Sequence, residues 1–202
     1  MNRSQIDRTT RFLTPRTLVL FAMVAFAVGY RLVVYFVPGL LPWNFTPVEA
    51  MALFGGACFA DRRLAILIPL AAMAVADTLI ALALPAAQLR DWIVMAPVIY
   101  ACIALTAFAG FALRGRVRIL NVALAAVGSA TGFFLVTNFF VWVGSGMYPA
   151  NISGLIACYV AGLPFYQYGS LPGTLLWSAV LFGTFALLSR RYTVLAGAPQ
   201  AA

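Results

Sequence analysis

Long runs of apolar residues, separated by short stretches that contain proline, glycine or arginine, dominate this chain. A helix needs ~20 apolar residues to cross a bilayer core that is about 30 Å thick. Most of the runs reach that length with few charges, which is typical of membrane-spanning helices. The pattern therefore predicts an all-α fold, a six-helix transmembrane bundle whose helices cover residues 17–36, 46–60, 64–84, 92–113, 119–143 and 172–189.

The second of these segments, 46–60, is shorter than the others and rich in small residues. Thr46 and Pro47 suit the N-cap and first position of a helix, and Glu49 stands where a capping box needs a carboxylate. A charged edge at 61–63 ends the segment. At 1.5 Å per residue the helix reaches only ~22 Å. We therefore expect it inside the bundle rather than at the lipid-facing rim.

Glycines occur in pairs at two places in the predicted helices. Gly55 and Gly56 are adjacent in the second helix, and Gly128 and Gly132 have GxxxG spacing in the fifth. Small residues let two helices approach closely in a membrane. We therefore interpret all four as close-packing positions.

Arginine residues gather at one set of helix ends. With the N-terminus on the inner side, Arg90 falls outside and Arg31 lies within the first helix. Cytoplasmic loops carry an excess of positive charge, so both termini are expected in the cytoplasm. This predicts a multi-pass protein of the inner, cytoplasmic membrane, with the lipid bilayer as its environment. The arginines assigned to the inner side are Arg3, Arg8, Arg11, Arg16, Arg62, Arg63, Arg114, Arg116, Arg118, Arg190 and Arg191.

A further apolar stretch, 152–165, lies in the long outer loop 144–171 and is too short to span comfortably. It contains Pro164 and several glycines, which favours a re-entrant or surface-lying helix over the outer mouth of the bundle. The expected organisation is a cytoplasmic N-terminal segment at 1–16, a six-helix membrane domain at 17–191 and a disordered tail at 192–202.

The composition supports the membrane assignment. Hydrophobic residues make up 64% of the chain and charged residues 9%, whereas a soluble domain averages ~25% charged residues. A net charge of +8 can indicate nucleic-acid binding, but these arginines flank apolar runs. We therefore expect no nucleic-acid partner.

The sequence offers no set of residues for catalysis or metal binding. It contains no histidine, the commonest general base and metal ligand. Cys58, Cys102 and Cys158 lie in separate apolar segments without CxxC spacing, and we interpret them as small buried hydrophobic side chains. No nucleophile motif, phosphate-binding loop or metal-ligand spacing is present. We therefore expect no enzymatic activity, catalytic residues, cofactor or metal.

Four polar side chains fall in the outer half of the predicted bundle. Arg31 lies ~21 Å and Asp77 ~20 Å from the inner side, at 1.5 Å per residue. Glu49 begins the second helix near the outer edge, and Asn138 lies in the last turns of the fifth. Charged groups are costly in a membrane unless they are paired or face water, so their convergence favours a functional site.

Each candidate also has a structural interpretation. Arg31 and Asp77 can form a structural ion pair, and Glu49 can serve as a capping-box carboxylate. Asn138 can link helices by a hydrogen bond, and Trp142 can belong to an aromatic belt instead of stacking on a planar ligand. The sequence leaves both interpretations open. The candidate ligand-binding residues are Arg31, Asn44, Glu49, Asp77, Asn138 and Trp142.

Several motifs carry a family resemblance. Residues 44–47 are Asn-Phe-Thr-Pro, and residues 53–57 are Leu-Phe-Gly-Gly-Ala. Together with Asp77 and the Thr-Asn-Phe segment at 137–139, they resemble a family of small, uncharacterised bacterial integral membrane proteins, a domain of unknown function. The resemblance covers residues 30–190 approximately and implies no established activity.

The layout is also similar to the S components, the substrate-binding subunits of energy-coupling-factor vitamin transporters. That resemblance implies six helices, cytoplasmic termini and an outward-facing pocket built by the first, third and fifth loops, here 38–45, 85–91 and 144–171. It also implies an energising membrane partner, which S components contact through alanines spaced by three on the first helix. This chain offers Ala25 and Gly29 in that helix, and they lie too high to match well.

We therefore expect a membrane protein that binds a small vitamin- or metabolite-like solute from the outer side and helps it cross. The alternative is a structural or assembly protein whose polar residues lock the bundle and whose outer segment docks a membrane partner. The two differ in one feature, since a transporter needs a cavity beneath the loop 144–171 and a scaffold is filled.

Overall fold

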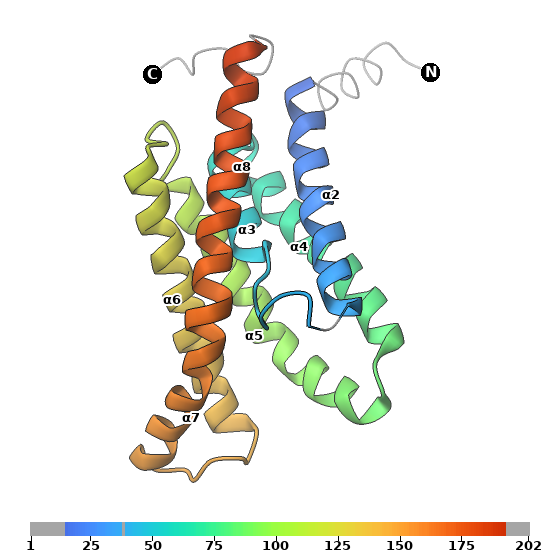
Figure 1. Ribbon diagram of the computed structural model, residues 1–202, viewed down its shortest axis with the longest axis vertical. Helices are drawn as coiled ribbons and strands as arrows, with labels where there is room; N and C mark the ends of the chain where they lie inside the picture. The colour runs from blue at the N-terminus through green and yellow to red at the C-terminus, as the bar shows by residue number, and fades with distance from the viewer. Residues whose placement is uncertain (1–14, 38, 193–202) are drawn as a thin grey trace.

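The computed structural model describes residues 15–37 and 39–192, and every regular element among them is helical. Figure 1 shows α2 beginning and α8 ending at the same end of the molecule. The elements are α2 (Pro15–Phe36), α3 (Val48–Cys58), α4 (Arg62–Ala83), α5 (Ala86–Phe111), α6 (Ile119–Gly144), α7 (Ile152–Phe165), the π-helical turn η1 (Tyr166–Ser170) and α8 (Leu171–Arg191).

These bounds confirm the all-α prediction and its six helical segments, because α7, η1 and α8 follow one another without a break. Among the described residues, four stretches are long and apolar enough to cross a membrane: α4, residues 88–111, α6 and residues 152–191. Large apolar side chains cover their outer faces, as with Leu105 (63% exposed) and Leu124 (62%). Such surfaces suit lipid rather than water. The chain is a multi-pass membrane protein.

The short helix α3 lies inside the bundle, as the sequence predicted. Ten of its 11 residues are buried. It packs against α2, α4, α5, α6 and α8, and Figure 1 shows these helices around it. Phe54 contributes most to this packing, because its ring meets those of Phe182 and Phe185 on α8 edge-on. A helix enclosed on all sides needs small residues where its neighbours come close.

The closest of these approaches joins α3 to α5. A Cβ added at Gly56 would collide with the backbone of Ala107 and Gly110, and one added at Gly110 would collide with the carbonyl of Leu53. Gly55 faces α4 on the other side, with the Ala65 carbonyl at 3.1 Å from an added Cβ. The prediction of close packing is confirmed for both glycines of α3.

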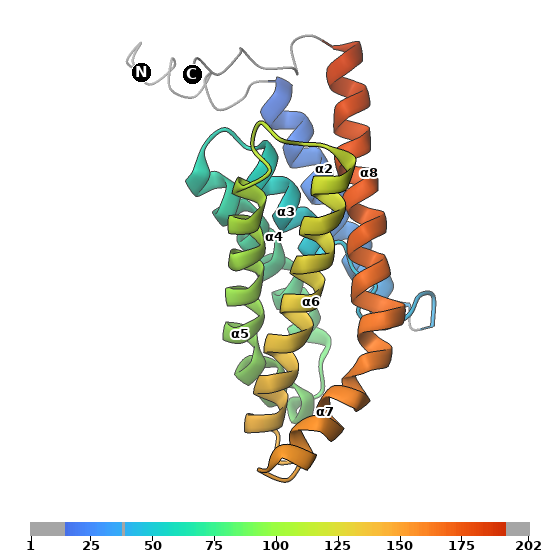
Figure 2. The same cartoon turned by 90° about the vertical axis from the view of Figure 1, so that its left-hand side faces the viewer.

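The same prediction is wrong for Gly128 and Gly132 of α6. A Cβ at either position would meet nothing within 4 Å. Both glycines instead line a groove of about 300 Å³ between α5 and α6. In Figure 2 these two helices lie side by side. GxxxG spacing leaves a flat face on a helix. In the described part of the chain, no other helix packs against this face at the two glycines.

The C-terminal end of α3 is capped by a side chain from beyond α5. The guanidinium of Arg114 donates to the carbonyls of Gly56 at 2.8 Å, Phe59 at 2.9 Å and Ala60 at 3.3 Å. Partial burial lowers the pKa of Arg114 from its ordinary value, but arginine stays charged in proteins. A cation suits the negative end of a helix dipole. One carbonyl in the last turn of this buried helix, and the two carbonyls just beyond its end, are therefore satisfied by a single side chain.

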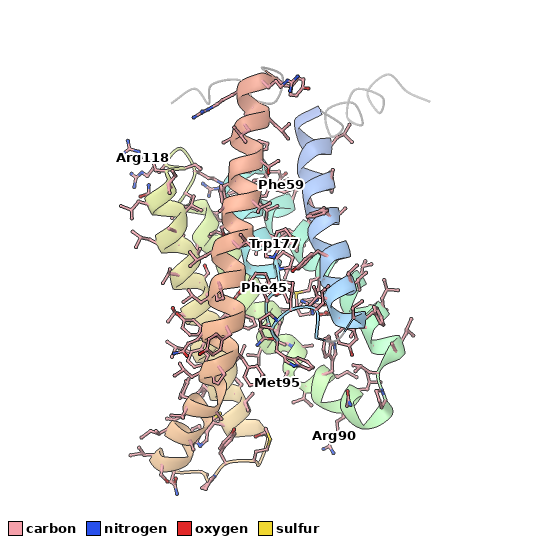
Figure 3. All side chains as sticks on the ribbon, viewed as in Figure 1. Phe45, Phe59, Arg90, Met95, Arg118 and Trp177 are labelled. Carbon is pink, nitrogen blue, oxygen red and sulfur yellow. The ribbon has the colours of Figure 1, made fainter. Side chains whose placement is uncertain are left out.

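Arginine side chains mark one end of the molecule. Figure 3 shows Arg118, in the turn between α5 and α6, at the opposite end from Arg90. Helix α8 ends with Arg190 and Arg191 at the Arg118 end. These arginines thus lie at one end of the molecule, as the predicted orientation requires. Which side of the membrane that end faces stays a prediction. The arginines of the first 14 residues and the predicted disordered tail after Tyr192 lie outside the described residues.

The apolar stretch 152–165 forms α7 with the predicted bounds, but it is joined directly to the last helix. The sequence predicted a separate helix within a loop. The turn η1 makes the connection, with the Leu171 N–H bonded to the carbonyl of Tyr166 five residues earlier. Pro172 then falls in the first turn of α8, where its missing N–H does no harm.

Replacing Gly56 by alanine is expected to destabilise the fold, because the added methyl group would collide with the backbone of α5. We expect a loss of about 1–3 kcal/mol in the free energy of unfolding, as in an overpacked core. The matched control is Gly128→Ala, where the new Cβ meets nothing within 4 Å. Equilibrium unfolding in detergent with added SDS measures both. Equal stability of the two variants would contradict the close approach of α3 and α5.

Candidate functional site

A cavity of about 460 Å³ lies between the loop that precedes α3 and helices α2, α3, α4 and α5. Phe133 of α6 and Ser170 of η1 complete its wall. Most of the wall is apolar, with Ile99 and Ile103 of α5 among its side chains. Segments that are far apart in the sequence thus meet around one space.

The loop before α3 turns back into the bundle. Figure 3 places Phe45 in the middle region of the long axis, and Figure 1 shows α3 starting there. The sequence interpretation put this start near the outer edge, and the structure corrects it. Gly169 and Gly173 explain the difference, because a Cβ on either would press against the loop backbone between Trp43 and Thr46.

Asn44 lies in the cavity wall at the turn of this loop. Its φ of 63° is in the left-handed region, which asparagine enters more readily than most residues. Its carbonyl accepts a hydrogen bond of 2.9 Å from the backbone N–H of Thr46. This turn directs the chain into α3.

Glu49, in the first turn of α3, lies in the cavity wall and is 4% exposed. Its Oε2 accepts a hydrogen bond of 2.6 Å from the Thr174 hydroxyl on α8, while its Oε1 has no partner among the described residues. The predicted capping box is wrong. Pro47 precedes α3, no side chain caps that end, and the Glu49 carboxylate is directed to α8 instead of back along its own helix.

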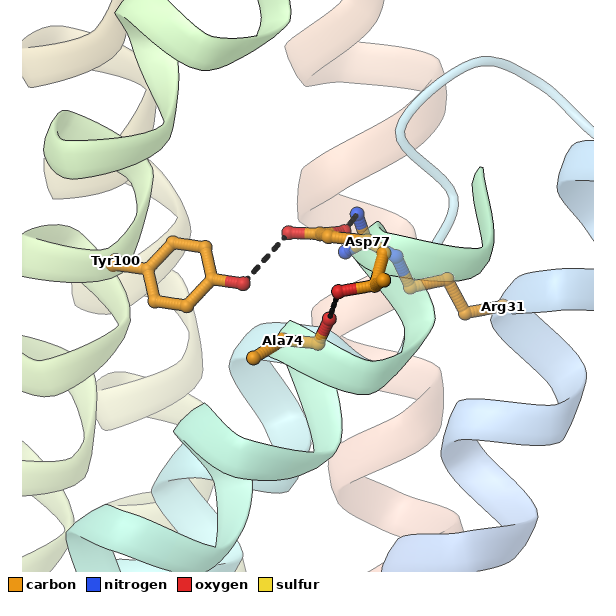
Figure 4. Close-up of polar contacts among 5 residues, drawn as sticks. Arg31, Ala74, Asp77 and Tyr100 are labelled. Atoms are coloured by element: carbon orange, nitrogen blue, oxygen red, sulfur yellow. Dashed lines mark hydrogen bonds and ion pairs between the residues drawn. The ribbon is translucent and has the colours of Figure 1, made fainter. Parts of the chain in front are cut away.

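Arg31 and Asp77 meet, as their similar predicted depths indicated. Nη2 of Arg31 on α2 donates to Oδ1 of Asp77 on α4 at 2.6 Å. The Tyr100 hydroxyl on α5 donates to Oδ2 at 3.1 Å (Figure 4). Both charged side chains are largely buried, at 15% and 11% exposed. This carboxylate therefore connects three helices, and Arg31 also lies in the cavity wall.

Asn138 lies against α7 but bonds within its own helix, and Trp142 bonds to the turn before α7. Nδ2 of Asn138 donates to the Phe134 carbonyl at 2.9 Å, and Gly162 of α7 lies directly on its amide group. Nε1 of Trp142 donates to the Pro149 carbonyl at 2.9 Å. Both side chains therefore serve contacts at the α7 end of the molecule.

The helical periodicity of α6 explains why these two residues are absent from the cavity wall. Phe133 reaches the cavity, and Asn138 follows five residues later, ~140° around the helix. The structure thus brings together Arg31, Asn44 and Glu49 at the cavity, with Asp77 bound to Arg31, and places Asn138 and Trp142 elsewhere.

Sequence reasoning missed Tyr100 and Thr174, which donate hydrogen bonds to the two buried carboxylates. Each carries a single hydroxyl within an apolar helix, and polar groups in such helices usually have a partner. That signal marks them as polar positions. The sequence does not indicate which residue the partner is, because it does not show how α5 and α8 are rotated about their axes.

The three cysteines are buried, as the sequence interpretation expected. Cys58, Cys102 and Cys158 form no disulfide with one another. Sγ of Cys158 donates to the carbonyl of Asn138 at 3.3 Å. In the part of the chain that the structure describes, no three His, Cys, Asp or Glu side chains gather closely enough to hold a metal ion. The polar groups in the cavity wall include those of Arg31, Asn44 and Glu49 and the hydroxyls of Tyr35, Thr46 and Ser170.

Removing the Asp77 carboxylate tests the structural role of the ion pair. Asp77→Ala is expected to lower the free energy of unfolding by ~3 kcal/mol, because the charge of Arg31 is left buried without a partner. The double variant Arg31→Met with Asp77→Leu should recover most of that loss, since it removes both charges. Unfolding in SDS–detergent mixtures measures the three proteins. Full stability of Asp77→Ala would show that the pair contributes nothing to the fold.

Comparison with known proteins places the chain in a family. Residues 12–198 match the model of a family of unknown function, DUF6580. The matched range includes every described helix and the whole wall of the cavity. No curated protein and no solved structure matches the chain. The protein belongs to the family of unknown function DUF6580.

Proposed function

We propose that this protein binds a small solute in the 460 Å³ cavity and helps it cross the membrane. The observation that carries the proposal is the cavity itself, with three polar candidate residues in its wall. The protein acts without enzymatic chemistry, in the inner membrane, with both termini in the cytoplasm.

The size and lining of the cavity support a binding role. Ligand pockets usually span about 300–1,000 Å³ and combine apolar walls with a few convergent polar groups. Arg31, Asn44 and Glu49 supply those groups here. They come from α2, the following loop and α3, so closing or opening the site needs only a shift among neighbouring segments.

The position of α3 supports transport rather than storage. This helix begins in the middle region of the molecule and not at one of its ends (Figure 1). Transporters commonly place substrate sites where a short or broken helix begins within the bundle, because its free N–H groups and dipole act on the substrate. The likeness to S components adds a vitamin- or metabolite-like solute and an energising membrane partner, and this addition rests on that resemblance alone.

A structural or assembly role is the second candidate. The observation that favours it is the network of Arg31, Asp77 and Tyr100, which connects three helices. The cavity favours the first candidate, because a protein that only supports others has no use for a large space with polar groups in its wall. The cavity wall includes Ser170 of the predicted outer loop 144–171 and Asn44 of the predicted first loop 38–45.

Mass spectrometry of small molecules released from protein purified in mild detergent tests the proposal. We expect one non-lipid compound in the wild-type protein. Val34→Trp should lose it, because Val34 lies in the cavity wall and the indole occupies part of the space.

The neighbouring residue on the same helix provides the control. Val33 is 53% exposed, so Val33→Trp makes the same change on the outer face and should keep the compound. Both variants should elute as folded protein on size exclusion. Lipid alone in all three samples, or a compound that Val34→Trp retains in full, would contradict binding in the cavity.

A further inference from the structure

The Glu49 carboxylate is an incompletely bonded acid in the cavity wall. It is 4% exposed, and one oxygen accepts from Thr174 while the other has no partner among the described residues. A buried acceptor without a donor costs free energy, and a buried charge without a counter-ion costs more. A cation in the cavity beside this carboxylate would reduce the cost of its charge.

The charges around the cavity are unequal. Arg31 is positive, but its guanidinium lies 2.6 Å from the Asp77 carboxylate, which balances it. Among the described residues, Glu49 takes part in no ion pair. In its ionised form, Glu49 is therefore the one charged group of the three at this site without a counter-ion.

Burial opposes the ionised form of Glu49, and two features favour it. The residue lies in the first turn of α3, where the helix dipole stabilises a negative charge. The Thr174 hydroxyl donates a short hydrogen bond to it, and hydrogen bonds to ionised acceptors are stronger than those to neutral ones. The surroundings thus supply part of what a carboxylate needs and leave it without a counter-ion.

Aromatic rings line the same space. Tyr35 and Trp92 lie in the wall with ring centroids 6.4 Å apart and nearly perpendicular. Trp43 also lines the cavity and is 76% exposed, which places it at the rim. Aromatic faces attract cations, and clusters of them recognise ammonium groups. The rings therefore favour a cation in the cavity, as ionised Glu49 does.

We propose that the cavity selects an organic cation, with its ammonium group beside the Glu49 carboxylate and an apolar body among the rings. This inference rests on the proposed binding function and names the class of its substrate. An anion would meet an arginine that is already paired, and a neutral molecule would leave the carboxylate charge unmatched.

Three probes that share one skeleton test the charge preference. 2-Phenylethylamine is a cation at pH 7, because primary amines have pKa values near that of lysine. 2-Phenylethanol keeps the size and a donor but is neutral, and L-phenylalanine adds a carboxylate. Isothermal titration into protein-loaded lipid nanodiscs, with empty nanodiscs subtracted, gives the affinity for each. We expect the amine to bind about tenfold or more tightly than the other two.

The variant Glu49→Gln tests the assignment to this residue. Glutamine keeps the size of the side chain and an oxygen for the Thr174 hydroxyl but removes the charge. Its affinity for the amine should fall to that for the alcohol, about tenfold or more. The control is Asp61→Asn, a carboxylate change at the start of α4 where asparagine can still accept from the backbone N–H of Arg63. It should leave all three affinities unchanged.

The outcomes separate the inference from the proposed function. Equal affinity for amine and alcohol, tighter binding of L-phenylalanine, or no binding of the amine would each overturn the cation preference. So would an unchanged preference in folded Glu49→Gln protein. The proposed function is judged separately, by the co-purified compound and the Val34→Trp comparison.

Discussion

A helix that is buried in a membrane protein cannot leave the polar groups at its ends to lipid, because lipid offers no hydrogen bonds. This constraint on the 11 residues of α3 organises the surrounding structure. Arg114 binds the carbonyls at its C-terminal end. It can do so because Gly56 and Gly110 let α3 and α5 touch backbone to backbone. Arg114 follows Gly110 by about one helical turn, so the same crossing that brings the helices together also positions the cap.

The cavity follows from the same short helix. α3 has 11 residues, whereas α4 and α6 have 22 and 26. At 1.5 Å per residue it occupies only ~17 Å along the bundle. The loop before it enters the remaining space and is held there against Gly169 and Gly173, but it does not fill that space. The first turn of α3, with Glu49, borders what is left. Length mismatch therefore provides both a cavity and a helix N-terminus facing it.

The sequence predicted the helices well because their apolar runs are long and their ends carry proline, glycine or arginine. It also predicted that α3 is interior and that Arg31 meets Asp77, since both follow from lengths and depths along single helices. What it missed depends on how helices are rotated against one another. Tyr100 and Thr174 were overlooked for that reason, and Asn138 and Trp142 were grouped with residues that they do not approach. Glu49 was expected to cap its own helix, since a capping motif is local in the sequence. Its hydrogen-bond partner, Thr174, is 125 residues away.

Arg31 belongs both to a structural ion pair and to the cavity wall, and the sequence had left these two interpretations open. A structural ion pair and a ligand site are usually alternatives for one arginine, but here the pair determines the character of the site. By balancing Arg31, Asp77 leaves Glu49 to set the sign of the charge in the cavity. Asp77 is itself held by Tyr100, so the position of Arg31 depends on α2, α4 and α5 together. The charge at the cavity wall is therefore a property of helix packing as well as of Glu49, and under the proposed cation binding, stability and selectivity are coupled through one guanidinium.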